Sequence, residues 1–261
     1  MLRTRIWTAL AVLPALLAAI IFAPNWLFTA IIAMLGAIAL FEIASMTEAH
    51  SAARVAILIG TALAPAAAVS IAPDSFMIVP ELTFVGTVLM MALMWVHGPE
   101  HAPHGAALTA IGGIYVGALF PYFAMLRNRP GGIALTILMM LLVAATDSAA
   151  YFVGRATGRI KLASNVSPNK TVEGALGGLA GALAAGLILR PFLVPGWDLK
   201  ALATVAIAVS LLAQVGDLVG SAIKRAARVK DSGWIFPGHG GLLDRTCSLV
   251  FTAALTYYYC R

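Results

Sequence analysis

The sequence predicts an all-α protein, a polytopic membrane bundle of about nine transmembrane helices with its N-terminus in the cytosol. Of its 261 residues, 61% are hydrophobic and 11% are charged, and the mean hydropathy is +0.93. Soluble chains average roughly 45–50% apolar and about 25% charged residues. This apolar excess is too large for one buried core, so part of it must face lipid. The composition therefore excludes a soluble cytosolic enzyme, a disordered regulator and a disulfide-stapled secreted module.

The apolar residues gather in runs of about the 20 residues that a membrane-spanning helix requires. Turn-forming pairs such as Pro24-Asn25 and Pro195-Gly196 separate these runs. The last run is the shortest, and it ends in consecutive tyrosines, which are typical of the aromatic belt at a membrane interface. The predicted spans are residues 5–22, 26–46, 53–72, 76–96, 106–126, 132–153, 174–194, 200–222 and 243–260.

The distribution of Lys and Arg predicts the orientation of the chain. With a cytosolic N-terminus, twelve of these residues fall on the cytosolic side and five on the other, as the positive-inside rule requires. The long polar connections 154–173 and 223–242 then face the cytosol, where we expect the active site of a multi-pass plasma (inner) membrane protein. We divide the chain into N-terminal transmembrane helices, 1–126, and a C-terminal catalytic region, 127–261. Loop Lys and Arg account for the net charge of +6, so no nucleic-acid partner is expected.

The first candidate cluster begins inside the span 132–153. Asp147, Tyr151 and Arg155 follow one another at intervals of four residues, which places them on one helical face. An ionisable residue within a span is costly and indicates function by default. The alternative is a structural carboxylate at a helix contact, paired with Arg155.

The second cluster lies between residues 167 and 174. Ser167 followed by Pro168 is typical of a helix N-cap with proline in the first turn, so we expect this segment to open the next span. A lysine, hydroxyls and free backbone N–H groups at a helix N-terminus suit an anionic ligand, although the segment could equally serve only as a cap. The candidates here are Ser167, Asn169, Lys170, Thr171 and Glu173.

The third cluster leaves the span 200–222 and enters the cytosolic loop. Asp217, Ser221, Lys224 and Arg228 follow at intervals of four, three and four residues, which predicts a single helical face. A glycine-rich turn then closes on an acid and a base, and its N–H groups could cradle phosphate. Carboxylates such as those of this cluster are what Mg²⁺ needs alongside water and substrate phosphates. The remaining candidates are Arg225, Lys230, Asp231, His239, Gly240, Gly241, Asp244 and Arg245.

Three features of the sequence stay open or carry less weight. A basic loop with an incidental glycine turn would explain the Lys and Arg of the third cluster, but not its acids. Glu42 and Glu81 lie within predicted spans and could line a cavity, pair inside the bundle or sit near an interface. His97, His101 and His104 have metal-like spacing, but the glycine and prolines among them favour a polar turn.

The second half of the chain closely resembles the phosphatidate cytidylyltransferase, or CDP-diacylglycerol synthase, family. The resemblance rests on three motifs in order: Asp147-x2-Ala150-Tyr151-x2-Gly154-Arg155-x2-Gly158, then Ser167-Pro168-x-Lys170-Thr171-x-Glu173-Gly174, then Ser221-x-Ile223-Lys224-Arg225-x4-Lys230-Asp231-x-Gly233-x2-Phe236-Pro237-x-His239-Gly240-Gly241-Leu242-x-Asp244-Arg245. It covers the chain from 147 onward, while the first half resembles the family only in being a string of hydrophobic helices. The family pattern has a second acid three residues after Asp244, and here that position is Cys247.

The resemblance implies an Mg²⁺-dependent enzyme that converts CTP and phosphatidate to CDP-diacylglycerol and diphosphate at the bilayer surface. A second cation and a homodimer are left open. It assigns Asp217 and Asp244 to the metal with Asp147 as a further acid. Lys170, Lys224, Arg225, Lys230 and Arg245 are expected to contact phosphates, and Asp231, His239 and Ser221 to support them. Tyr151, Arg155, Ser167, Asn169, Thr171, Glu173, Gly240 and Gly241 are expected to bind substrate. The alternatives are a polytopic transporter, a CTP-dependent lipid kinase and a paralogue weakened at Cys247.

Overall fold

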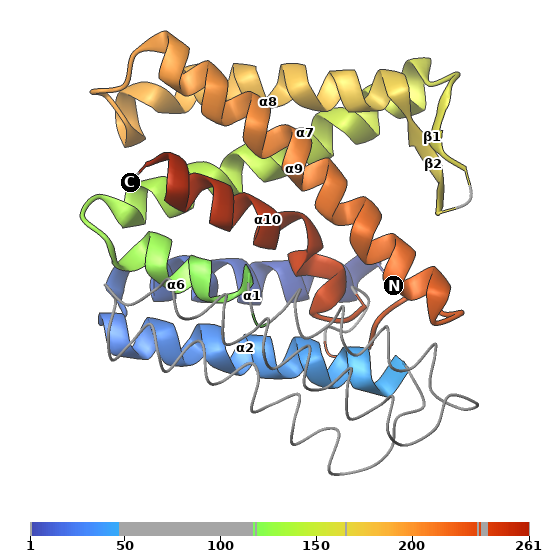
Figure 1. Cartoon of the computed structure of the whole chain (residues 1–261), viewed down its shortest axis with the longest axis horizontal. Coiled ribbons are helices and arrows are strands. Elements are labelled where there is room, and N and C mark those ends of the chain that lie inside the picture. Colours follow the sequence, from blue (N-terminus) through green and yellow to red (C-terminus); the bar gives the residue numbers. More distant parts are fainter. Residues whose placement is uncertain are drawn as a thin grey trace, which may run out of the picture. The chain divides into compact units, whose positions relative to one another are not determined.

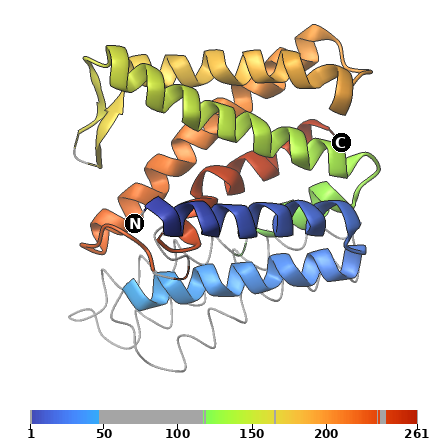
Figure 2. The same cartoon turned by 180° about the vertical axis from the view of Figure 1, so that it is seen from behind.

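The computed structural model describes residues 2–46, 117, 119–164, 166–233, 235 and 240–260. Over these residues the chain forms seven helices and one two-stranded sheet (Figure 1, and from behind in Figure 2). The predicted helical architecture is therefore confirmed, and the small sheet is an addition to it. The elements are α1 (Leu2–Phe22), α2 (Asn25–Met46), α6 (Pro121–Asn128), α7 (Gly132–Thr157), β1 (Lys161–Ala163), β2 (Ser167–Thr171), α8 (Val172–Leu193), α9 (Leu199–Ala226) and α10 (Leu243–Tyr259).

Four of the described helices, α2, α7, α8 and α9, are long and apolar enough to cross a membrane. In α1 the apolar stretch is shorter, Val12–Phe22, and α10 has 17 residues. The predicted spans 53–72 and 76–96 lie outside the described residues, as does most of 106–126. A membrane protein is thus supported, while the number of nine spans and the cytosolic N-terminus stay predictions.

The described chain forms two compact units. One contains residues of Met1–Met125 and Ile223–Arg245, and the other contains residues of Leu126–Ala222 and Thr246–Arg261. In the second unit α7 packs along α8. Small residues allow this close contact: a Cβ on Gly177 would come within 2.6 Å of the Cβ of Val153. The small-residue spacing at the start of α8 is therefore a packing feature.

A β-hairpin connects α7 to α8, and the sequence did not predict it. The strands pair antiparallel, with Lys161 opposite Thr171 and Ala163 opposite Ser167. Ser167 was expected to cap the next helix, and this prediction is wrong, because its backbone is committed to the strand. The cap is Thr171, which has extended backbone and whose Oγ1 accepts a hydrogen bond of 3.1 Å from the N–H of Gly174.

Helix α9 ends earlier than the predicted helical face requires. Its last residue is Ala226, and Arg228 has a φ of +58°, a left-handed conformation outside the helix. The prediction that Arg228 continues the face of Asp217 is therefore wrong. At the other end, the carboxylate of Asp198 accepts a 2.6 Å hydrogen bond from the N–H of Ala201 and caps the helix.

Candidate active site

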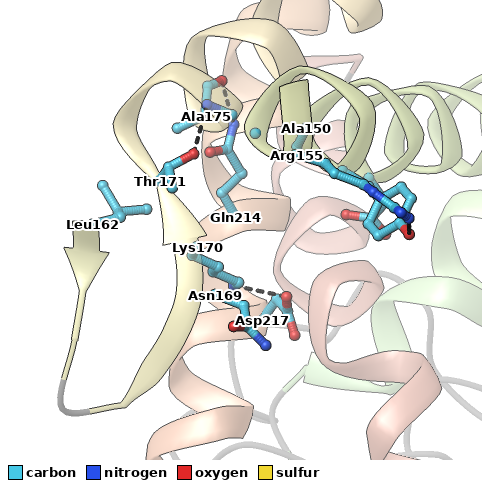
Figure 3. Close-up of a pocket in the computed structure, with 13 residues that line it drawn as sticks. Ala150, Arg155, Leu162, Asn169, Lys170, Thr171, Ala175, Gln214 and Asp217 are labelled. Atoms are coloured by element: carbon cyan, nitrogen blue, oxygen red, sulfur yellow. Dashed lines mark hydrogen bonds and ion pairs between the residues drawn. The ribbon is translucent and has the colours of Figure 1, made fainter. Parts of the chain in front are cut away.

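A pocket of about 490 Å³ lies in the second unit, where α7, the hairpin, the start of α8 and the middle of α9 meet (Figure 3). Its volume falls in the range of roughly 300–1,000 Å³ that is usual for small-molecule sites. It is lined by Asp147, Ala150, Tyr151, Gly154, Arg155, Leu162, Asn169, Lys170, Thr171, Gly174, Ala175, Gln214 and Asp217. Residues of the first two predicted clusters and Asp217 of the third therefore contribute to one cavity.

An ion pair between the hairpin and α9 occupies this pocket. Lys170 Nζ lies 2.7 Å from Asp217 Oδ2, and Figure 3 shows the two side chains pointing toward each other. The side chains are 25% and 46% exposed. Nζ itself is shielded from solvent and makes no hydrogen bond of normal geometry to the described residues, so this contact is an ion pair only. An ammonium has three donors, and Lys170 therefore retains donors for a further anion.

Asp147 supplies a second carboxylate to the pocket. It comes from α7, and its charge interacts with those of Asp217 and Lys170. With all three groups ionised, two negative charges face one positive charge, which favours a bound cation. Among the described residues Arg155 forms no ion pair with a carboxylate. Its Nη1 instead donates a 3.0 Å hydrogen bond to the hydroxyl of Tyr151, so the alternative of an Asp147–Arg155 pair receives no support.

The remaining residues of the second cluster have different positions. Asn169 and Thr171 line the pocket. Glu173, at the start of α8, accepts hydrogen bonds of 3.2 and 3.3 Å from the N–H of Ile160, and it holds the segment between α7 and β1 to the start of α8. Ser167, on β2, and Ser221, on α9, do not line this pocket.

Sequence reasoning missed Gln214. Its Nε2 donates to the carbonyl of Ala175 at 3.2 Å, which joins α9 to α8, and to Ser210 Oγ at 3.3 Å within α9 (Figure 3). The available signal was a polar side chain inside an apolar span, three residues before Asp217.

A second set of functional candidates lies in the first unit, around Asp244. Lys224 Nζ lies 2.5 Å from Asp244 Oδ1. Asp244 Oδ2 accepts hydrogen bonds of 3.0 Å from the N–H groups of both Ser232 and Gly241, and one of 3.2 Å from Ser232 Oγ. Gly240, with φ +82°, makes the turn that brings the Gly241 N–H to the carboxylate. Both oxygens of Asp244 are therefore occupied.

The environment of Asp244 favours its charged form. Hydrogen bonds from Lys224, Ser232 and Gly241 stabilise its carboxylate form over the neutral acid. A cation bound here would have to replace Lys224 as the partner.

The other charged residues of the loop have exposed side chains. Arg225 Nη1 donates to the carbonyl of Val229 at 3.1 Å, and both Lys230 and Arg245 are exposed, as is Asp231. His239 and Glu81 lie outside the described residues. His97, His101 and His104 also lie outside them.

Glu42 is one of the two acids of the first half whose role the sequence left open. It is 3% exposed at the end of α2, and its carboxylate accepts hydrogen bonds from Ser232 Oγ, Leu242 N and Leu243 N. Of the alternatives for Glu42, pairing inside the protein is therefore the one that the structure supports.

Comparison with known proteins identifies the family. A family model described as "Cytidylyltransferase family" matches residues 3–261. The chain belongs to the cytidylyltransferase family. Proteins named phosphatidate cytidylyltransferase are similar to it: that of Brucella suis biovar 1 is 39% identical over 177 residues, which are 67% of this chain and 62% of that protein.

Relatives from two other organisms have the same name. The Synechocystis protein is 45% identical over 134 residues, 51% of this chain and 45% of that protein. The Bacillus subtilis protein is 42% identical over 146 residues, 56% of this chain and 54% of that protein. The matches thus span about half to three fifths of the length of these curated cytidylyltransferases.

Proposed function

We propose that this chain is a phosphatidate cytidylyltransferase, which converts CTP and phosphatidate to CDP-diacylglycerol and diphosphate. The observation that carries the proposal is the pocket in which the Lys170–Asp217 pair lies with Asp147. A transferred nucleotide needs cationic donors for its phosphates and carboxylates for a metal ion, and this pocket offers both. The names of its relatives give the substrate class.

The reaction needs little covalent participation from the protein. A phosphate oxygen of phosphatidate attacks the α-phosphorus of CTP, and the bond between that phosphorus and the oxygen of the β,γ-diphosphate breaks. An ionised phosphate monoester is already a nucleophile, so no strong base is required. Catalysis then rests on holding the two substrates in line and neutralising the charge that moves to the leaving diphosphate.

The pocket residues have distinct roles in this proposal. Lys170, with donors left after its pairing with Asp217, contacts a phosphate of CTP. Arg155, oriented by the hydroxyl of Tyr151, offers its guanidinium to a second phosphate, since a guanidinium can bind phosphate through two donors. Thr171, whose Oγ1 caps α8, fixes the hairpin end that carries Lys170.

The donors of the pocket fit Mg²⁺. The described residues contain no group of three or more acidic, His or Cys side chains that could enclose a metal. Mg²⁺ is commonly bound by one or two carboxylates together with water and substrate phosphates. Asp147 and Asp217 could provide these carboxylates. When bound, it would stabilise the negative charge on the reacting phosphates. The family resemblance also assigns Asp244 to a metal ion, and we keep it as a proposed metal ligand, with a second cation as an open extension.

Loop and membrane assignments complete the proposal. Lys224, Arg225, Lys230 and Arg245 contact phosphates, with Asp231, His239, Ser221 and the glycines of the turn in support. The protein spans the inner (plasma) membrane about nine times, with the active site facing the cytosol and the acyl chains of phosphatidate in lipid. A homodimer is compatible with this arrangement.

The product distinguishes this function from a CTP-dependent lipid kinase and from a transporter. Detergent-purified protein is incubated with phosphatidate, Mg²⁺ and CTP labelled either in the cytosine ring or in the γ-phosphoryl group. We expect the cytosine label in the lipid phase and the γ-label in the aqueous phase as diphosphate. A kinase would give the reverse distribution, and a transporter would leave both labels in water. Either of these results would contradict the proposal.

A further inference from the structure

We infer that Glu42, in the first half of the chain, is a positioning residue for the turn that carries Asp244. This inference rests on the proposed function, which assigns Asp244 and its partner Lys224 to the metal and the phosphates. Glu42 lies 190 residues before Ser232 in the sequence, yet the two side chains are hydrogen bonded at 2.8 Å. The contact therefore links a helix without recognisable motif residues to the most motif-rich segment.

The carboxylate of Glu42 acts as an acceptor toward three donors. Oε1 accepts from the N–H of Leu242 at 2.7 Å, and Oε2 accepts from the N–H of Leu243 at 2.9 Å and from the hydroxyl of Ser232. The two N–H groups lie at the N-terminus of α10, where backbone donors have no partner within the helix. Glu42 thus fixes the start of the helix whose first turn contains Asp244.

Ser232 transmits this constraint to Asp244. Its N–H donates to Asp244 Oδ2 at 3.0 Å, and its hydroxyl lies 2.8 Å from Glu42 Oε2 and 3.2 Å from Asp244 Oδ2. Asp244 in turn contacts Lys224. One hydroxyl proton serves either carboxylate, so Ser232 connects two acids that would otherwise repel each other.

The backbone at two glycines lies so close to the Glu42 carboxylate that neither position has room for a Cβ atom. A Cβ on Gly233 would come within 2.9 Å of Glu42 Oε1, and one on Gly241 within 2.5 Å of Oε2. The close approach of the chain to this carboxylate therefore requires glycine at these two positions of the third motif. Burying a carboxylate is costly unless it is fully hydrogen bonded, and an apolar side chain would have filled the space without that cost.

The test compares E42Q with wild type in two measurements. The NH₂ group of Gln is a donor, and it would face at least one of the three donors that now point at Glu42, namely the N–H groups of Leu242 and Leu243 and the hydroxyl of Ser232. We expect kcat for cytidylyl transfer to fall on the order of 10–100-fold, the rate equivalent of one lost buried hydrogen bond, while KM for CTP changes little. In hydrogen exchange, the amides of Leu242 and Leu243 should exchange faster by a similar factor, and this readout does not depend on activity.

A matched control removes a helix-capping carboxylate elsewhere. D198N changes the exposed acid that caps α9, and it should leave kcat and the exchange of Leu242 and Leu243 as in wild type. S232A is the second variant, for the case that E42Q does not fold. S232A removes only the hydroxyl between Glu42 and Asp244, so it should lower kcat less than E42Q does. In the double variant, the fold-reduction in kcat should be smaller than the product of the two single fold-reductions.

The outcomes separate the inference from the proposed function. Wild-type protein without cytidylyl transfer would overturn the proposed function, and the exchange of Leu242 and Leu243 would still test Glu42. Active wild type with E42Q and S232A at wild-type kcat, or E42Q with unchanged exchange, would overturn the positioning role.

Discussion

Cys247 stands where the cytidylyltransferase pattern has an acid, and its surroundings explain what a thiol does there. It is 3% exposed, on the side of α10 that faces α9. A methyl group added to Gly220 or Gly216 would overlap Cys247, at Sγ and at the backbone carbonyl respectively. The side chain therefore fills a tight helix contact. A thiol is also a poor ligand for Mg²⁺, which prefers oxygen.

We predict that Cys247→Ala retains cytidylyl transfer. Because the thiol packs against α9 and is not assigned to the metal, its loss should cost about 1 kcal/mol of unfolding free energy and leave kcat nearly unchanged. Turnover and thermal unfolding of the detergent-purified variant check this. A folded Cys247→Ala without turnover would show that the thiol takes part in the reaction.

At the residue scale, much of the pocket could be predicted. Asp147 was predicted because an ionisable residue inside a span is costly. Lys170 was predicted because a lysine at a helix N-terminus suits an anion, and Asp217 because its carboxylate suits Mg²⁺. All three line one pocket. Gln214 was not predicted, because a neutral amide in an apolar span is a weaker indication of function than a charged group. The role of Glu42 was undecidable, since its three donors come from a segment about 200 residues away.

At the scale of elements, the contact of α7 with α8 forms one wall of the pocket. Both helices contribute lining residues, among them Ala150 on α7 and Ala175 on α8. Glycines of α8 permit this approach, and the stiff, β-branched Val153 faces Gly177. The geometry of the pocket thus depends on small residues that do not themselves touch a ligand.

Gly177→Ala should destabilise the protein by about 1–3 kcal/mol. The added methyl group would overlap Val153, and this overpacking outweighs the higher helix propensity of alanine. Gly196→Ala is the control, because a Cβ there meets nothing within 4 Å. Thermal unfolding in detergent measures both variants. Equal stability of the two would contradict close packing of α7 against α8.

The helices themselves could be predicted from apolar runs, but their ends could not. The run that gives α7 predicts an end at 153, and the helix continues to Thr157, because polar residues such as Arg155 are compatible with a helix that leaves the membrane. The hairpin was missed because strand β2, Ser167–Thr171, has no alternation of apolar and polar residues. Its formation depends on pairing with β1, which a local pattern does not reveal.

At the scale of the whole molecule, the charge distribution makes a prediction about topology. Lys200 and Lys230 are both exposed and are expected on opposite sides of the membrane. In a Cys260→Ser background, Lys200→Cys should react with an impermeant maleimide in intact cells, whereas Lys230→Cys should react only after lysis. The reverse pattern would invert the orientation and place the loop 223–242 outside the cytosol.

The central claim is that the pocket around Asp217 transfers a cytidylyl group, and one assay tests it most directly. Wild type, Asp217→Asn and the control Asp198→Asn, at the N-terminal cap of the same helix, are compared with phosphatidate and cytosine-labelled CTP, in Mg²⁺ or EDTA. We predict Mg²⁺-dependent label in lipid for wild type and Asp198→Asn. The rate of folded Asp217→Asn should be lower by at least on the order of 100-fold, because the substitution removes both a cation ligand and the partner of Lys170. Wild-type transfer by Asp217→Asn, or label that enters lipid equally in EDTA, would contradict the account.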